Sequence, residues 1–234
     1  MQSKKIINVF LPTDLEPIEL TNQLNERIKI RPMYFELGFS SSSNIYGRRI
    51  LVDNLMRALE YLPLNIGFLV WDVYRPRAIQ AKLFHWMQGE IRKKLPQLNE
   101  DENYNETCKY MSPPSNVGDV YCPPHLSGGA IDLTFYDMVT GHELDMGTPF
   151  DDCTDRAHSL YFDQRSDLTE NEKCIKERRN LLRFAMENSG FVSYQYEWWH
   201  FDIGNIFWSR KTGQPEAFGS LFDDEEWPAF GARI

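Results

Sequence analysis

PHLSGGAID, at residues 124–132, is the stretch around which the rest of the chain can be interpreted. It contains His125 and Asp132, seven positions apart, with two glycines between them. A zinc ion binds imidazole nitrogen and carboxylate oxygen at roughly 2.0–2.2 Å, but seven extended residues would separate these groups by about 23 Å. One ion can hold both only if the chain reverses. Gly128 and Gly129 can adopt the positive φ angles that such a reversal often needs.

A third ligand must come from elsewhere, and the best source is EWWH at residues 197–200. His125, Asp132 and His200 would form a set of two histidines and one carboxylate with an open fourth position, as is common at catalytic zinc sites. The alternative is that each histidine is an ordinary satisfied polar side chain and that Asp132 caps a turn. For any one residue alone this alternative is the better interpretation. For the set, the glycines and the nearby Glu197 favour a metal site.

Glu197 is a candidate acid/base. A carboxylate that is not itself a ligand can take the proton of a zinc-activated water and pass it to a leaving amine. Glu197 precedes His200 by three positions, and residues three apart on a regular strand point to opposite faces. The pair therefore requires a bend, a strand end or a bulge. The alternative is a surface glutamate in a salt bridge, which fits less well beside two tryptophans.

Arg75 and Asp151 are the other polar candidates. Arg75 directly follows an apolar run, a position from which a side chain can point into a cleft. Its guanidinium could stabilise the oxyanion of a tetrahedral intermediate or hold a substrate carboxylate. An ion pair with Asp72 is equally compatible with the sequence. Asp151 follows a loop sequence and signals nothing alone, but in a peptidase it could hold a substrate ammonium.

Hydrophobic periodicity and capping residues predict the main elements. We expect helices over residues 50–62 and 76–95, and a third that opens with a capping box at 169–172 and stops at Gly190. We expect strands at 67–71, 130–136 and 191–201 and around Tyr34 and Phe35, and a long loop over 96–122. This order predicts an α+β fold, a mainly antiparallel sheet flanked by helices.

Composition limits the class of protein. With 234 residues and 42% hydrophobic residues, one domain over 1–234 is expected, with no motif placed in residues 1–30 or 204–234. The net charge of -9 argues against nucleic acid and anionic membrane partners, which need basic patches. The four cysteines contain no C-x-x-C pair, which disfavours a cysteine zinc site. Neither a clear signal peptide nor a membrane span of ~20 apolar residues is recognisable, so a cytoplasmic location is expected.

Five segments together resemble the zinc D-alanyl-D-alanine dipeptidases, the VanX-like group within the wider D,D-peptidase and hedgehog-like fold. The central one is His-x-x-Gly-x-Ala-x-Asp at 125–132. The others are WDVYRP at 71–76, MGTPFD at 146–151, MENSGF at 186–191 and EWWH at 197–200. They occur in the order found in the family and span most of the chain.

The resemblance implies a zinc ion, one per chain, on His125, Asp132 and His200, with Glu197 as the catalytic acid/base. It also implies that the reaction is the hydrolysis of D-Ala-D-Ala to two D-alanines. Such an enzyme would act in cell-wall peptide turnover or in glycopeptide resistance. The oligomeric state is left open.

Three further roles follow from the same resemblance. Arg75 would stabilise the transition state, Asp151 would bind the amino group of the dipeptide, and Tyr34 would line that pocket. One position departs from the family: Pro123 stands where the pattern has a serine, so a hydroxyl is absent there. The alternatives are a D,D-carboxypeptidase or endopeptidase acting on longer muropeptides, and a non-catalytic zinc-stabilised binding module.

Overall fold

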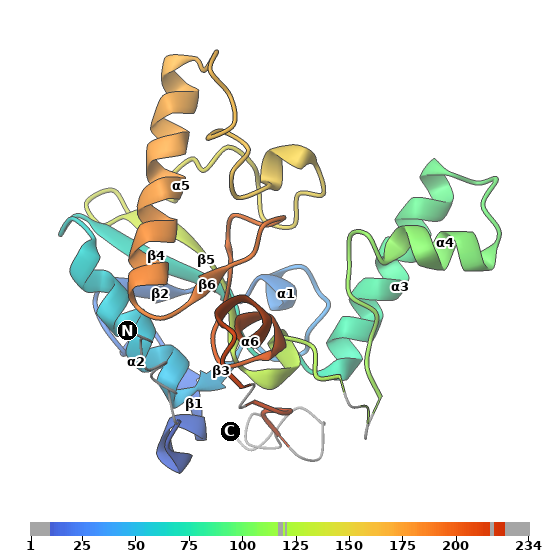
Figure 1. Cartoon of the computed structure of the whole chain (residues 1–234), viewed down its shortest axis with the longest axis horizontal. Helices are drawn as coiled ribbons and strands as arrows, with labels where there is room; N and C mark the ends of the chain where they lie inside the picture. Colours follow the sequence, from blue (N-terminus) through green and yellow to red (C-terminus); the bar gives the residue numbers. More distant parts are fainter. Residues whose placement is uncertain (1–9, 117–118, 120, 216–217, 223–234) are drawn as a thin grey trace, which may run out of the picture.

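The computed structural model describes residues 10–116, 119, 121–215 and 218–222. Its centre is a five-stranded sheet in the order β2-β4-β5-β7-β6 (Figure 1). These strands are Ile28–Ile30 (β2), Ile66–Asp72 (β4), Ala130–Asp137 (β5), Val192–Ser193 (β6) and His200–Asp202 (β7). A second sheet pairs Pro17–Leu20 (β1) with Ile45–Arg48 (β3) in antiparallel fashion.

The central sheet is mixed, so the expectation of a mainly antiparallel sheet is only partly right. β4 pairs with β5, and β7 with β5 and β6, all antiparallel, but β2 runs parallel to β4. A parallel pair needs a long crossover, and the chain between β2 and β4 contains β3 and the helix Arg49–Ala58 (α2). The apolar runs of β4 and β5 are buried and form the core, where the rings of Phe68 and Phe135 stack at 5.8 Å.

The three predicted long helices are confirmed as α2, Arg77–Lys94 (α3) and Glu170–Asn188 (α5). A short 3-10 turn, Leu59–Tyr61, extends α2, and α2 contacts α5 beside the sheet (Figure 1). The expected capping box opens α5: Thr169 Oγ1 accepts from the Glu172 backbone N–H, and the Glu172 carboxylate accepts from the Thr169 N–H. Gly190, with φ +99°, follows its end.

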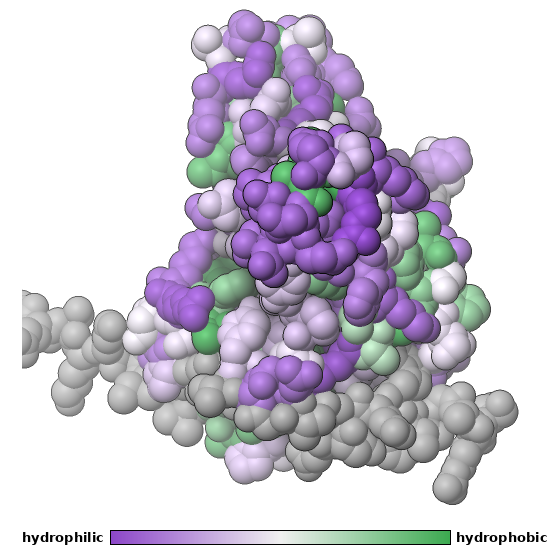
Figure 2. All heavy atoms as spheres, turned by 90° about the vertical axis from the view of Figure 1, so that its right-hand side faces the viewer, coloured by the Kyte–Doolittle hydropathy of each residue, from purple (hydrophilic) through white to green (hydrophobic). Residues whose placement is uncertain are grey.

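The prediction of a long loop over 96–122 is wrong in part, because it contains the helix Glu100–Thr107 (α4). A second capping box opens it, since Asn99 Oδ1 accepts from the Glu102 N–H at 3.0 Å and Glu102 accepts from the Asn99 N–H at 2.9 Å. α4 is short and highly polar, so hydrophobic periodicity does not reveal it. It packs on α3, and the pair projects from one side of the molecule with a mostly hydrophilic outer surface (Figures 1 and 2).

The predicted strand around Tyr34 and Phe35 is wrong, because these residues lie in the one-turn helix Met33–Glu36 (α1). Pro32 precedes the turn, where its fixed φ favours helix initiation. The chain then folds back, and the N–H groups of Phe39 and Ser40 both donate to the carbonyl of Tyr34. The Tyr34 side chain is consequently buried.

The predicted strand over 191–201 is also wrong as a single element, since β6 and β7 are separated by a turn. Trp198 and Trp199 are adjacent and both buried, which a strand with one exposed face cannot achieve. The turn is held from outside the sheet, where the Trp198 N–H donates to the Ala157 carbonyl. Glu197 lies in this turn, so the bend that the pairing with His200 required is present.

The region from residue 204 onward contains the helix Ile206–Thr212 (α6), which the sequence pattern did not predict. Asn205 caps it by accepting from two backbone N–H groups. Beyond α6, the Leu221 N–H donates to the Leu126 carbonyl, and both Phe218 and Leu221 are buried. The described part of the C-terminal region therefore packs into the core. Within the described residues, no helix combines the length and apolar character that a bilayer crossing requires.

Candidate metal centre

Three neighbouring strands bring polar side chains together at one end of the sheet. Asp132 of β5 pairs directly with His200 of β7 and with Asp72 of β4. The β4–β5 register shifts by one residue between Val70 and Asp72, a bulge. Without this shift Trp71 would oppose Asp132, so the bulge brings Asp72 alongside Asp132.

His125 reaches the same place from the turn that precedes β5. It begins a 3-10 turn, His125–Ser127, which Gly128 ends in the left-handed conformation with φ +65°. The expected reversal at the glycines is thus present. Gly129 serves a different purpose, because a Cβ there would lie only 2.4 Å from the Ile203 carbonyl oxygen. This reversal of the chain brings the side chain of His125 close to that of Asp132, although the two residues are seven positions apart in the sequence.

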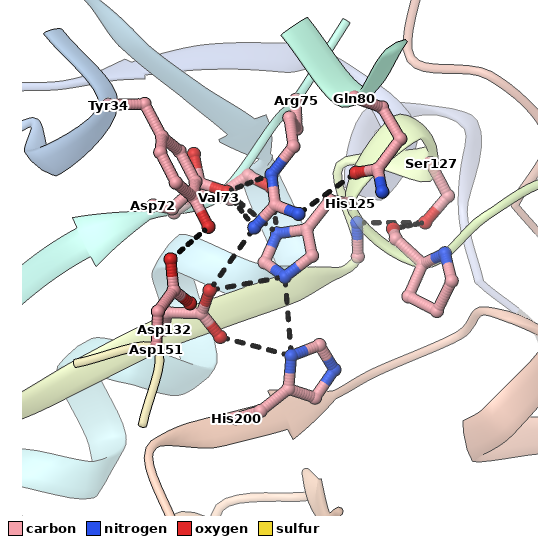
Figure 3. Close-up of polar contacts among 12 residues, drawn as sticks. Tyr34, Asp72, Val73, Arg75, Gln80, His125, Ser127, Asp132, Asp151 and His200 are labelled. Carbon is pink, nitrogen blue, oxygen red and sulfur yellow. Dashed lines mark hydrogen bonds and ion pairs between the residues drawn. The ribbon is translucent and has the colours of Figure 1, made fainter. Parts of the chain in front are cut away.

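The three predicted ligands converge (Figure 3). His125 Nε2 lies 3.2 Å from His200 Nδ1 and 3.3 Å from Asp132 Oδ2, and His200 Nδ1 lies 3.0 Å from Asp132 Oδ1. One ligand atom from each residue can be chosen so that all lie within 4.8 Å of one another. All three side chains are buried.

The other nitrogen of each histidine is held by a hydrogen-bond acceptor. His125 Nδ1 lies 2.7 Å from the Val73 carbonyl oxygen, and His200 Nε2 lies 3.0 Å from Asp202 Oδ1. These contacts assign the ring proton to Nδ1 of His125 and to Nε2 of His200. The lone pairs of the remaining two nitrogens would then face each other and a carboxylate, an arrangement that either a bound metal ion or a further proton on His200 relieves. The donor set fits zinc, and acceptors behind the histidines are what metal-binding imidazoles usually have.

The charges around the centre favour a cation there. Burial works against a positive charge on His200, but Asp202 and Asp132 raise its pKa well above the ordinary value. Burial also works against the charged form of Asp132, but His125 and His200 hold its pKa well below the usual range. The carboxylate is therefore ionised at neutral pH, as a metal ligand must be.

Glu197 lies beside the three ligands without belonging to the closest group. Its Oε2 is 3.7 Å from His200 Nδ1, and one third (33%) of its side chain is exposed, toward the cavity that it lines. Enclosure by the cavity walls raises the pKa of Glu197, and Asp132 adds to this, whereas His200 lowers it. A raised pKa makes this carboxylate a stronger base, which suits a group that takes a proton from water.

Arg75 forms the ion pair with Asp72 that was one of the two interpretations of its sequence position. Its Nε and Nη2 each lie 2.9 Å from Asp72 Oδ2, which is the ion pair, and Nη1 donates to Gln80 Oε1 at 2.9 Å. Nη2 is also 3.5 Å from Asp132 Oδ2, so the guanidinium reaches the metal centre (Figure 3). Asp72 additionally lies 3.2 Å from His125 Nδ1. Sequence reasoning considered Asp72 only as a competing partner of Arg75, whereas it contacts both Arg75 and His125.

Asp151 and Tyr34 meet on the other side of the centre. The Tyr34 hydroxyl donates to Asp151 Oδ2 at 3.0 Å, and the Tyr34 ring lies under the Arg75 guanidinium at 4.5 Å. Asp151 has a φ of +58°, which is unusual for a residue other than glycine. Burial, together with Asp132 and Glu197, raises the pKa of Asp151 to about 7.

One cavity of ≈ 140 Å³ is lined by the three candidate metal ligands and by Glu197, Arg75, Asp151 and Tyr34. A second cavity of ≈ 240 Å³ adjoins it, and Asp151 and Glu197 line both. The second cavity continues along Cys153 and Trp199. The candidate site is therefore a recess whose inner end is buried and polar. The second cavity adds space next to Asp151 and Glu197.

Val73 and Asp202 were not identified from the sequence. Asp202 had a usable signal, because residues two apart on a strand share a face and it follows His200 by two. Val73 contributes only a backbone carbonyl, which no residue pattern reveals.

Comparison with known proteins places this site in context. The family described as D-ala-D-ala dipeptidase matches residues 45–214. D-alanyl-D-alanine dipeptidase of Enterococcus faecium is 31% identical over 163 residues, 68% of this chain and 73% of that protein. The enzyme of that name from Synechocystis sp. is 31% identical over 157 residues, 62% and 63% of the two chains. The one from Escherichia coli is 27% identical over 197 residues, 78% and 86%.

Proposed function

Because the chain belongs to the D-ala-D-ala dipeptidase family of peptidases, we propose that it hydrolyses D-alanyl-D-alanine to two D-alanines. The observation that carries this proposal is the convergence of two imidazole nitrogens and a carboxylate within 4.8 Å. The second nitrogen of each histidine has an acceptor behind it. A binding module would need the ion but not Glu197 and Arg75, which both line the same cavity.

His125 Nε2, His200 Nδ1 and the Asp132 carboxylate would hold one zinc ion. When bound, zinc in such a site polarises a carbonyl and lowers the pKa of water to about 7. Val73 and Asp202 fix the two rings by accepting their N–H groups. His125 and His200 hold the pKa of Asp132 well below its usual range and so keep it ionised.

Glu197 moves the proton. Its Oε2 accepts a proton from the attacking water and then delivers it to the nitrogen of the departing D-alanine. Glu197 is suited to this exchange because burial raises its pKa above the ordinary value for a glutamate, which makes it a stronger base. It approaches the centre from the turn before β7, so it need not be a ligand itself.

Arg75 donates to the oxyanion that develops on the scissile carbonyl oxygen. The two contacts with Asp72 orient its guanidinium before substrate arrives, and such preorganised donors reduce the reorganisation needed in the transition state. Asp151 binds the substrate ammonium, and the Tyr34 hydroxyl holds the Asp151 carboxylate in place.

A second candidate substrate is a longer peptide ending in D-Ala-D-Ala. The adjoining cavity of ≈ 240 Å³ favours it, because this space lies next to Asp151, where the amino end of a dipeptide would bind. Such a peptide has no ammonium at this position, so its hydrolysis should not depend on Asp151.

Release of free D-alanine tests the proposal. We expect D-Ala-D-Ala to be hydrolysed, activity to stop with a zinc chelator and to return with zinc. Glu197→Ala should keep zinc and lose activity by about 10²–10⁴-fold. L-Ala-L-Ala and an amino-blocked D-Ala-D-Ala serve as substrate controls. A wild-type protein that loads zinc but cleaves only the blocked peptide would favour the second candidate.

A further inference from the structure

Asp72 holds the guanidinium of Arg75 at a single atom. Both Nε and Nη2 of Arg75 lie 2.9 Å from the same oxygen, Asp72 Oδ2. A planar group that is held at one oxygen can still rock about that oxygen, and the approach of Nη2 to Asp132, at 3.5 Å, is too long to fix the plane. A guanidinium that donates to an oxyanion must be oriented before the reaction begins. Arg75 therefore needs a second anchor, on the side of Nη1.

Gln80 contacts Arg75 on that side. Its Oε1 accepts from Arg75 Nη1 at 2.9 Å (Figure 3), and its Nε2 donates to the Ser112 carbonyl at 2.6 Å. A carbonyl oxygen can only accept, so the amide nitrogen of Gln80 must face Ser112 and the amide oxygen must face Arg75. Gln80 is buried in the first turn of α3, where its backbone N–H donates to the Pro76 carbonyl at 3.1 Å. Both the backbone and the amide of Gln80 are therefore held in place.

The contact with Gln80 still leaves Arg75 a donor for the reaction. A guanidinium has five N–H groups, two of them on Nη1. One N–H of Nη1 donates to Gln80, and none of the described residues accepts the other. Because Arg75 lines the cavity of ≈ 140 Å³, this second N–H can serve the scissile carbonyl oxygen. Gln80 thereby sets the direction of the donor that the hydrolysis would use.

We propose that Gln80 is a positioning residue, which fixes the plane of the Arg75 guanidinium so that Nη1 points at the developing oxyanion. This inference rests on the function proposed above, because it takes from it the role of Arg75. Ser112 lines the same cavity, so Gln80 also joins Arg75 to the wall that follows α4. Gln80 acts through Arg75 and makes no contact with the substrate.

Gln80→Met tests this role, because methionine has a similar length but no comparable donor or acceptor. We expect kcat for D-Ala-D-Ala to fall roughly 10- to 100-fold, the range expected for loss of a hydrogen bond to a charged group. KM and zinc affinity should be nearly unchanged. Gln80→Glu keeps the acceptor for Arg75 and removes only the donor to Ser112, so it should retain more of kcat than Gln80→Met. Unchanged kcat in Gln80→Met, a loss that appears in KM instead, or equal losses in the two variants would overturn the inference.

A double-mutant cycle shows whether Gln80 acts through Arg75. In the Arg75→Ala background, Gln80→Met should lower kcat by less than about 3-fold, because the group that Gln80 orients is absent. The same fold loss in both backgrounds contradicts the inference. Gln88→Met is the matched control, since Gln88 is a half-buried glutamine of the same helix that lines neither cavity. It should leave kcat unchanged in both backgrounds.

The NMR signals of the Arg75 side chain separate this inference from the proposed function. Rotation about the Nε–Cζ bond interchanges Nη1 and Nη2, and partners on both nitrogens slow it. In the zinc-loaded protein, the Arg75 signals are those that disappear in Arg75→Ala, and their exchange should be roughly 10-fold faster in Gln80→Met. Faster exchange supports the inference even if D-Ala-D-Ala is not a substrate. Unchanged exchange contradicts it even if hydrolysis is rapid.

Discussion

Asp202 Oδ1 lies 3.0 Å from Nε2 of His200 and also accepts from Asn205 Nδ2 at 2.7 Å. Asp202 is buried, and its carboxylate accepts hydrogen bonds that offset the loss of hydration. These bonds orient the imidazole of His200 and the helix-capping side chain of Asn205. The pair joins the metal centre to the start of α6. Residues outside the candidate ligand set therefore determine which nitrogen of His200 would face a bound cation.

We expect Asp202→Ala to weaken zinc binding about 10- to 100-fold, because loss of such a partner leaves the ring orientation and tautomer of the ligand unfixed. Competition with a chromogenic chelator measures the affinity. Asp163→Ala is the control, since it removes a carboxylate that Lys176 and Arg183 hold outside both cavities. Equal zinc affinity in the wild-type and Asp202→Ala proteins would contradict the assigned role.

Arg75→Ala should lower kcat by about 10²–10³, as the removal of a comparable oxyanion donor does elsewhere. Zinc affinity should fall much less, because Arg75 contacts Asp132 only at 3.5 Å. Single-turnover kinetics and metal titration on the same preparation separate the two effects. A loss of zinc that matches the loss of activity would mean that Arg75 acts by holding the ligands.

The pKa of about 7 on Asp151 predicts a pH dependence. Below pH 7 this carboxyl is increasingly protonated and cannot attract the substrate ammonium. The α-amine of the dipeptide, with a pKa near 7.7–8.0, is still charged there. We therefore expect kcat/KM to fall as pH decreases through about 7, with a smaller change in kcat, since bound ammonium keeps Asp151 ionised. The pH profile of Asp151→Asn should lack this decline; if it persists unchanged, another group causes it.

Gly128→Ala should disturb the metal centre through the turn that carries His125. The positive φ costs an alanine about 1–2 kcal/mol, and a Cβ there would lie 2.9 Å from a Leu221 methyl carbon. Gly38→Ala is a matched control with φ +80° and no atom within 4 Å of the added carbon. Thermal unfolding should show both losses, the larger at Gly128. Zinc affinity should decrease only in the Gly128 variant.

The elements foreseen from the sequence are those with strong local signals. Apolar periodicity, or an apolar run with clear ends, predicts α2, α3, α5, β4 and β5. All five elements are present in the structure. α1 and α4 were missed because one is a single turn after Pro32 and the other is polar throughout. The parallel pairing of β2 depends on the crossover through α2, which local patterns do not encode.

The candidate site was foreseeable to a similar extent. The spacing of His125 and Asp132 and the aromatic run before His200 identify groups that the fold brings together. The partners of those groups depend on register, and Asp72 is the clearest case. On a regular ladder Trp71, not Asp72, would oppose Asp132. No counting along the sequence reveals that β4 contains one extra residue at this point.

The bulge in β4 makes the site sensitive to strand register as well as to residue identity. A ladder that lost the bulge with every residue retained could keep both strands paired, with Trp71 opposite Asp132 and Asp72 turned to the far side of the sheet. Arg75 and His125 would then lack the oxygen that they share. Substitutions that straighten β4 between Val70 and Asp72 are therefore a route to inactive relatives whose motifs remain complete.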